Sequence, residues 1–160
     1  PCTDEIISYV SNKGFTVSSI LNNTQILSVS KNSSLQSLSW KADGSAVCCF
    51  EESGTFLVFD PRQPQTCESF NQSFKNMKII WENDTPYVLG FGSQKEFNNK
   101  IVVAIDTRNS GNVLSKQNID SSIGYMFPCY DSDTGMIVVA SKGGNSIYFL
   151  EFTSSGLTNR

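Results

Sequence analysis

The chain has 160 residues, enough for one ordinary domain or for part of a larger one. Hydrophobic residues make up 39% and charged residues 17%, a composition that argues against a disordered tail and for a packed core. The net charge of −3 excludes the basic footprint of a nucleic-acid-binding domain, and no apolar run reaches the roughly 20 residues of a membrane span. We therefore expect a globular protein that contacts no nucleic acid and has no membrane span.

Histidine is absent from the sequence, and its absence restricts the possible chemistry. The usual serine–histidine and cysteine–histidine nucleophiles are excluded, as are zinc sites that contain histidine. The five cysteines include no C-x-x-C spacing, and their odd number favours a reduced, cytoplasmic chain. We predict that the protein is not an enzyme and has no catalytic residue, no cofactor and no metal.

Short apolar runs, each closed by turn residues, occupy most of the chain. The 33 Val, Ile and Thr residues stand against only four Ala, a balance that favours strands over helices. No window shows the 3.6-residue apolar period of a long helix. In chain order we expect strands at 5–10, 15–20, 25–29, 35–40, 46–50, 55–59, 77–81, 87–91, 100–105, 123–127, 136–140 and 146–152, with weaker ones at 65–70 and 113–114.

Pairs of an apolar residue and an acid close three of these strands at a nearly constant spacing. The acids Asp60, Asp106 and Glu151 are 46 and 45 residues apart. Trp40 and Trp81, which close two earlier strands, are 41 residues apart. A period of about 40–45 residues with four strands per unit is typical of a WD-type β-propeller, in which neighbouring blades bury each other's faces. The sequence therefore predicts an all-β propeller fold.

The repeat divides the chain into about three and a half four-stranded antiparallel blades. We expect a partial blade at 1–33, blades at 34–72, 73–120 and 121–155, and a tail at 156–160. Propellers usually have four to eight blades and close on themselves, so an open arc exposes two sheet faces. We expect this arc to be part of a seven-bladed ring, which the remainder of the propeller or a second copy of the chain completes.

Three stretches of the sequence resemble successive blades of the coronin family. The first combines SLSWKADG at 37–44 with FLVFDPR at 56–62, and the second combines VLGFG at 88–92 with VAIDTR at 103–108. The third is YDSDTGMIVVASKGGNSI at 130–147. Phe, Ile or Leu stands where the family has tryptophan before the acid, and residues 1–33 match poorly. This divergence suggests an unusual coronin of the long tandem-propeller type.

The resemblance implies a function in the cytoplasm and in association with the cytoskeleton. A coronin-like WD-repeat module is expected to bind actin filaments (F-actin) and to regulate actin assembly through the actin-related nucleating complex. The mechanism is surface complementarity with salt-sensitive charge contacts. The alternative is a generic WD-repeat scaffold that acts in vesicle trafficking or in substrate adaptation for a ubiquitin ligase.

Four basic residues are the candidates for contacts with a partner. Arg62 and Arg108 lie just beyond strands and are expected on one rim of the propeller. Lys95 and Lys100 lie within and next to the polar insertion 93–99, the best candidate for a recognition loop, since loops on rigid scaffolds carry function.

The remaining acids, the cysteines and the repeated positions are expected to have structural roles. Asp131 and Asp133 are expected in a turn rather than at a cation, because no further ligands follow at calcium-loop spacing. Cys48 and Cys49 point to opposite faces of one strand, so we expect one thiol to be buried between blades and the other to be exposed. The repeated positions are expected to pack between blades or to cap turns: Trp40, Asp60, Trp81, Asp106 and Glu151.

Overall fold

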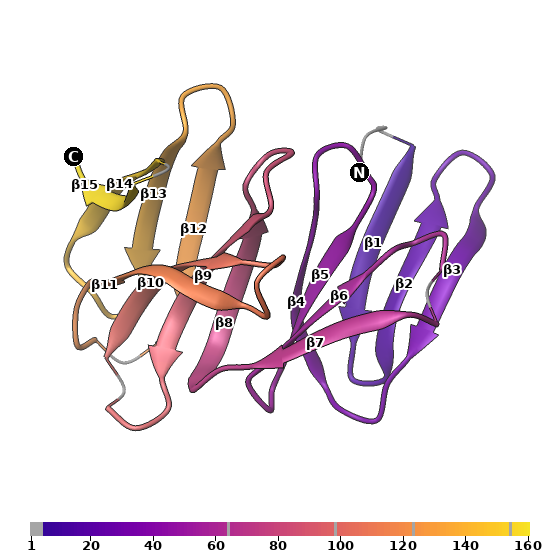
Figure 1. Cartoon of the computed structure of the whole chain (residues 1–160), viewed down its shortest axis with the longest axis horizontal. Coiled ribbons are helices and arrows are strands. Elements are labelled where there is room, and N and C mark those ends of the chain that lie inside the picture. The colour runs from indigo at the N-terminus through magenta and orange to yellow at the C-terminus, as the bar shows by residue number, and fades with distance from the viewer. Residues whose placement is uncertain (1–4, 64, 98, 123, 154) are drawn as a thin grey trace.

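The computed structural model describes residues 5–63, 65–97, 99–122, 124–153 and 155–160, which form four antiparallel sheets (Figure 1). Sheet 1 contains β1 (Ile6–Ser11), β2 (Gly14–Ser19) and β3 (Thr24–Ser30). Sheet 2 contains β4 (Leu35–Trp40), β5 (Val47–Glu51), β6 (Thr55–Phe59) and β7 (Cys67–Asn71). Sheet 3 contains β8 (Phe74–Trp81), β9 (Tyr87–Gln94), β10 (Lys100–Asp106) and β11 (Asn112–Asn118). Sheet 4 contains β12 (Met126–Asp131), β13 (Met136–Ser141), β14 (Ile147–Thr153) and β15 (Gly156–Asn159).

The four sheets are meanders arranged side by side as blades, which confirms the all-β propeller prediction (Figure 1). Successive strands pair within each sheet, and the first strands β1, β4, β8 and β12 are neighbours from sheet to sheet. These first strands therefore form the inner side of an arc. Among the described residues there is no helix long and apolar enough to cross a membrane.

The last strand corrects the expected boundary of the final blade. Residues 156–160 were expected to be a tail, but Gly156–Asn159 forms β15 and pairs with β14. Gly156 has a φ of +121°, which suits glycine at the tight turn between the two strands. The strand has four residues and a single large apolar side chain, Leu157, so it has no detectable alternation. Residue 123 of the expected strand 123–127 lies outside the described residues.

Apolar side chains from neighbouring sheets form the buried clusters that hold the arc together. Phe15 of sheet 1 packs with Phe59 of sheet 2, their ring centroids 5.3 Å apart. Phe50 and Phe56 of sheet 2 are fully buried in a second cluster that faces sheet 3. A third cluster joins sheets 3 and 4 and contains Leu89, Phe91, Val102, Ala104, Met126, Ile137, Val139 and Leu150. Sheets 2 and 3 are therefore covered on both faces.

The coverage of sheet 2 corrects the expectation for its two adjacent cysteines. Cys48 and Cys49 are both fully buried, because one faces sheet 3 and the other faces sheet 1. Burial raises the pKa of the Cys48 thiol, and it raises the pKa of Cys49 to about 12. Neither thiol is exposed as was expected for one of them.

Serine side chains also connect the inner strands of sheets 2 and 3. The hydroxyl of Ser37 accepts a hydrogen bond from the Ile79 N–H at 3.1 Å, and that of Ser39 accepts one from the Trp81 N–H at 2.8 Å. These bonds satisfy backbone donors at the bulged inner edge of sheet 3. They fix β4 against β8 and so position the side chains that both strands carry.

Candidate functional site

The first two repeated acids cap equivalent turns on the rim of the arc. Asp60 Oδ1 accepts hydrogen bonds from the Arg62 N–H at 2.9 Å and from its Nε at 3.3 Å. Asp106 accepts the same two bonds from Arg108, at 3.0 and 3.1 Å, and a third from the guanidinium at 3.0 Å. The side-chain hydrogen bond from Arg108 lowers the pKa of Asp106. Each arginine thus binds the acid two residues before it. Its side chain remains largely exposed, with an exposed fraction of 73% for Arg62 and 65% for Arg108.

The third acid has a different partner. Glu151 pairs with Met136 in the strand ladder, in the way that Asp106 pairs with Tyr87. The β14 strand continues past Glu151, and the carboxylate forms an ion pair with Arg160 beyond β15. The Glu151 carboxylate is therefore held by the residue that follows the neighbouring strand β15 rather than by the turn after its own strand.

The two tryptophans at the repeat positions lie in different surroundings. Trp81 is buried in the cluster between sheets 2 and 3, and its indole N–H donates to the Thr85 carbonyl at 2.7 Å. Trp40 is half-buried and donates to the Ser8 hydroxyl of sheet 1 at 2.5 Å. Both rings pack within the arc, and Trp40 also links sheets 1 and 2.

The predicted lysines do not join the arginines. Arg62 and Arg108 follow the last residues of β6 and β10, whereas Lys95 lies in the β9–β10 connection at the opposite end of β10. Lys95 is exposed, and its ammonium donates to the Ser53 carbonyl of sheet 2. The four basic residues therefore do not form one patch.

Lys100 lies inside the fold and corrects the expectation of a surface contact. Its exposed fraction is 3%, because every residue of β10 is buried between two neighbouring sheets. The ammonium donates to the Ser93 hydroxyl at 3.1 Å and to the Gly124 carbonyl. Burial lowers the pKa of Lys100. This lysine connects sheet 3 to the segment that leads into sheet 4.

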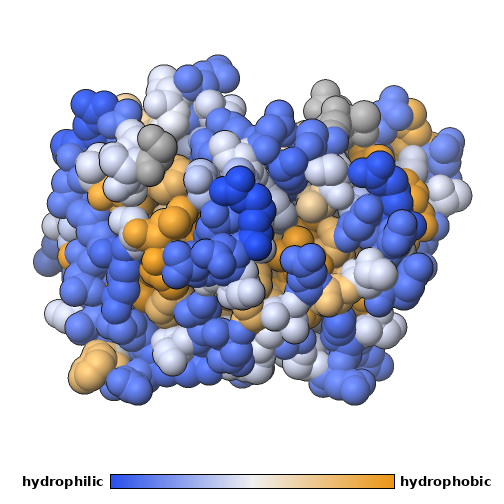
Figure 2. Space-filling view, viewed as in Figure 1, coloured by the Kyte–Doolittle hydropathy of each residue, from blue (hydrophilic) through white to orange (hydrophobic). Residues whose placement is uncertain are grey.

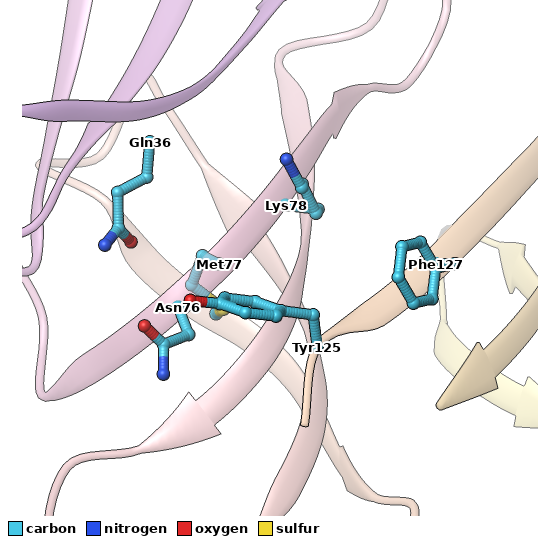
Figure 3. Close-up of a pocket in the computed structure, with 6 residues that line it drawn as sticks. All are labelled: Gln36, Asn76, Met77, Lys78, Tyr125 and Phe127. Atoms are coloured by element: carbon cyan, nitrogen blue, oxygen red, sulfur yellow. The ribbon is translucent and has the colours of Figure 1, made fainter. Parts of the chain in front are cut away.

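A hollow of about 360 Å³ lies where the inner strands of sheets 2, 3 and 4 begin (Figure 3). Gln36 of β4, Lys78 of β8 and Tyr125, just before β12, line it. Figure 3 shows Tyr125 extending over Met77, with its hydroxyl on the side of Gln36 and Asn76. The volume lies within the range of small-ligand pockets. We call this hollow the axial pocket; Phe127 completes its lining.

Two β-bulges shape the axial pocket. The pairing of β4 with β5 shifts between Leu35 and Ser37, which places Gln36 at the irregularity. The pairing of β8 with β9 shifts between Lys75 and Lys78, around Asn76, whose φ is +55°. Asparagine tolerates this left-handed conformation better than most residues. Bulges redirect side chains, and they are frequent next to functional sites.

Glycines of β9 make room for the second bulge. A Cβ atom on Gly92 would lie 2.4 Å from Met77 Sδ and 2.8 Å from the Lys75 carbonyl oxygen. A Cβ on Gly90 would lie 2.9 Å from Met77 Cε. Only a residue without a side chain fits this close approach of Met77 and the β8 backbone. The VLGFG stretch therefore allows Met77 to fold inward while Asn76 and Lys78 line the pocket.

Known proteins resemble the chain in sequence and in fold. Coronin-7 of Rattus norvegicus is 30% identical over 124 residues, which are 74% of this chain and 13% of that protein. Coronin-A of Dictyostelium discoideum is 29% identical over 119 residues, 73% of this chain and 26% of that protein. The WD40 domain of Toxoplasma gondii coronin has a TM-score of 0.84 at 22% identity, covering 98% of this chain and 42% of that one. This chain is a coronin homologue. No family model matches it.

The coronin homology confirms the family resemblance that the sequence motifs indicated. Identity to Coronin-7 and to Coronin-A is almost equal, although the matched stretch is 13% of the first protein and 26% of the second. The chain thus spans about an eighth of one relative and a quarter of the other. Among its described residues no cluster of three or more Cys, Asp or Glu side chains could hold a metal ion.

Sequence reasoning missed the axial pocket of this coronin homologue. Gln36, Asn76 and Tyr125 belong to no recognisable motif, and Lys78 is one of several lysines in the sequence. The close Gly90 and Gly92 were the available signal, because paired glycines inside a strand often mark a bulge or a close backbone approach.

Proposed function

We propose that the chain is a non-enzymatic interaction module that binds actin filaments and regulates their assembly together with the actin-related nucleating complex. The observation that carries this proposal is coronin homology over 73–74% of the chain on a WD40 fold. In this proposal the protein acts in the cytoplasm, on the actin cytoskeleton. Surface contacts rather than bond chemistry perform the function.

The rim with Arg62 and Arg108 is the proposed contact surface. Both guanidinium groups are held by their acids and still largely exposed, so little side-chain freedom remains to be lost when they meet an acidic surface. Such contacts steer association and weaken as salt screens them over about 10 Å at 0.1 M. Lys95, at the other end of β10, provides a matched control.

Co-sedimentation of the full protein with actin filaments tests this proposal. We expect pelleting at low salt, release as salt rises, and weaker pelleting for R62A/R108A than for K95A. Wild-type protein that stays in the supernatant at the lowest salt contradicts actin binding. Affinity capture that recovers coat or ubiquitin-ligase subunits and no actin would instead support the scaffold alternative.

A further sheet is proposed to cover the open face of sheet 4. The neighbouring pairs Phe50–Phe56 of sheet 2 and Phe91–Val102 of sheet 3 are fully buried. The ladder places Ala140–Ile147 at the same rows of sheet 4, where Ile147 is 61% exposed. Because this row is buried in sheets 2 and 3 and apolar in sheet 4, we expect it to be buried in sheet 4 by another blade.

The ring in this proposal is completed by blades that the described residues do not supply. The chain covers 42% of the coronin WD40 chain that it superimposes on, and two copies would bring eight sheets rather than the expected seven. These two facts favour the remainder of one propeller over a second copy.

Native mass and thiol labelling test the covering sheet. Cys129 is exposed on the open face of sheet 4. We expect a mass above that of a single copy of this chain and protection of Cys129 from maleimide in the assembled protein. A single-copy mass together with rapid labelling of Cys129 would contradict the proposal.

A further inference from the structure

The polar side chains of the axial pocket are unpaired, unlike the charges on the rim. In the described part of the chain, Gln36, Asn76 and Lys78 have no side-chain hydrogen bond or ion pair, and neither does the hydroxyl of Tyr125. The Gln36 Oε1 atom is buried and accepts no hydrogen bond, which is rare for a buried polar atom in a folded protein. Arg62, by contrast, is bound by its neighbouring acid.

The pocket brings these groups together from three separate sheets. Gln36 and Asn76 lie at bulges, and the Asn76 backbone adopts a left-handed conformation. Lys78 directly follows the second bulge and contributes the one charge among the described residues of the lining. Tyr125 and Phe127 are 53% and 57% exposed and add aromatic surface. Convergent polar groups beside an apolar wall are typical of a recognition pocket.

We propose that the axial pocket binds an extended acidic peptide segment. Each carboxamide, of Gln36 and Asn76, offers one donor group and one acceptor, which match the two polar groups of a peptide bond. The ammonium of Lys78 selects a carboxylate, because a charge-assisted hydrogen bond is stronger than a neutral one. Tyr125 and Phe127 accommodate an apolar side chain next to the acid.

This site is distinct from the proposed contact with actin filaments. Asn76 lies near the start of β8, whereas Trp81 ends the same strand beside Arg108. The pocket therefore lies at the end of the inner strand that is remote from the arginine rim. The inference goes beyond the proposed function and can fail independently of it.

Fluorescence anisotropy of the full protein tests the pocket with two labelled peptides. One alternates glutamate with leucine, and its control carries glutamine in place of each glutamate. We expect saturable binding of the acidic peptide, at least about tenfold tighter than that of the control, with salt-dependent affinity. Amide chemical-shift changes are expected at Gln36, Asn76, Lys78 and Tyr125.

Variants locate the binding and identify the group that recognises the charge. K78M keeps the alkyl stem and is expected to weaken acidic-peptide binding about tenfold and to remove its preference over the control peptide. K116M is the matched control, because Lys116 is an exposed lysine on the outer strand β11, and its affinity should equal that of wild type. N76G preserves the left-handed backbone without the carboxamide and should weaken both peptides about threefold to tenfold.

A charge exchange completes the test. K78E should reject the glutamate peptide and bind a peptide that alternates lysine with leucine. Equal binding of both original peptides by wild type, equal affinities of wild type and K78M, or no saturable binding by wild type each overturn the proposal. Filament pelleting that persists while peptide binding is absent overturns the pocket alone, and the converse overturns actin binding alone.

Discussion

Sheets 3 and 4 are both four-stranded meanders, but the described residues cover sheet 3 on both faces and sheet 4 on only one. In sheet 3 each residue of β10 is buried, whereas in sheet 4 the equivalent strand β14 has a buried Leu150 between exposed and half-buried neighbours. The residues themselves are similar in kind, because Ile147 and Phe149 are as apolar as Val102 and Ala104, which occupy the same rows. The difference shows that position in the arc, and not composition, sets burial.

The surface view shows the consequence of this difference for the whole molecule. Polar side chains cover most of the face drawn in Figure 2, and apolar ones gather in patches that include the side where β2 and β3 lie. Ile20, Leu21 and Ile26 are more than half exposed there. Exposed apolar groups at both ends of the arc are what a chain of stacked blades leaves uncovered.

The largest effect is expected from removing an aromatic ring between two covered sheets. F50A should lower the free energy of unfolding by about 3–5 kcal/mol, because Phe50 is fully buried and its loss leaves a cavity. F149A removes a ring that is 47% exposed on sheet 4 and should cost the chain less than about 1 kcal/mol. Urea unfolding measures both, and equal losses would contradict the comparison of covered and open faces.

Thiol reactivity sharpens the same comparison without a mutation. In this chain by itself, with no further sheet over sheet 4, Cys129 should react with a maleimide at least about tenfold faster than Cys48 and Cys49. Burial raises the pKa values of both sheet 2 thiols, so the reactive thiolate is scarce as well as inaccessible. Mass spectrometry of peptides from the labelled, folded chain by itself gives the three rates. Rapid labelling of Cys48 in folded protein would show that sheet 2 opens locally.

A smaller effect is expected at the turn acid of sheet 3. D106N should cost about 1 kcal/mol at neutral pH, because it weakens the hydrogen bonds to Arg108. The pKa of Asp106 is lower in the folded state than its unfolded value of about 3.9, so the ionised form stabilises the fold above that value. The stabilisation disappears as the pH falls through the lowered pKa. Urea unfolding as a function of pH should show the two proteins converging in acid, and a constant difference would contradict this origin.

The smallest effect is expected at the equivalent turn of sheet 2. R62A should change the free energy of unfolding by less than about 0.5 kcal/mol, because exposed ion pairs contribute little. Thermal unfolding next to R108A provides the comparison. A larger loss of unfolding free energy for R62A than for R108A would contradict the expected ranking of the two turns.

The strand pattern and the repeat could be predicted from the sequence because both are spacings along the chain, of a few residues within a strand and of 41–46 residues between repeats. Strands that pack on covered faces, such as β10, appear as continuous apolar runs. Burial alternates along β11 but not along the short β7, and β15 is too short for any period, which is why residues 156–160 were expected to be a tail. The acid of each repeat was likewise visible as an apolar–acid pair.

The candidate sites were harder to predict from the sequence because they depend on contacts between sheets. Lys100 follows a polar loop and therefore resembled a surface lysine, yet strand register brings its ammonium to Ser93. Arg108 and Lys95 were grouped by charge, although they lie beyond opposite ends of β10. Gln36 and Asn76 are 40 residues apart, and only the packing of neighbouring inner strands places them in one pocket.

The sequence by itself determined most of the strands and turns, because these are encoded in residues close together along the chain. It also determined the repeat and the likeness to coronins, because the motifs recur in order along the chain. The tertiary structure alone decided which faces are covered, which charges are paired and which polar groups remain free. Burial and pairing depend on the neighbouring sheet, whose residues lie about one repeat away in sequence.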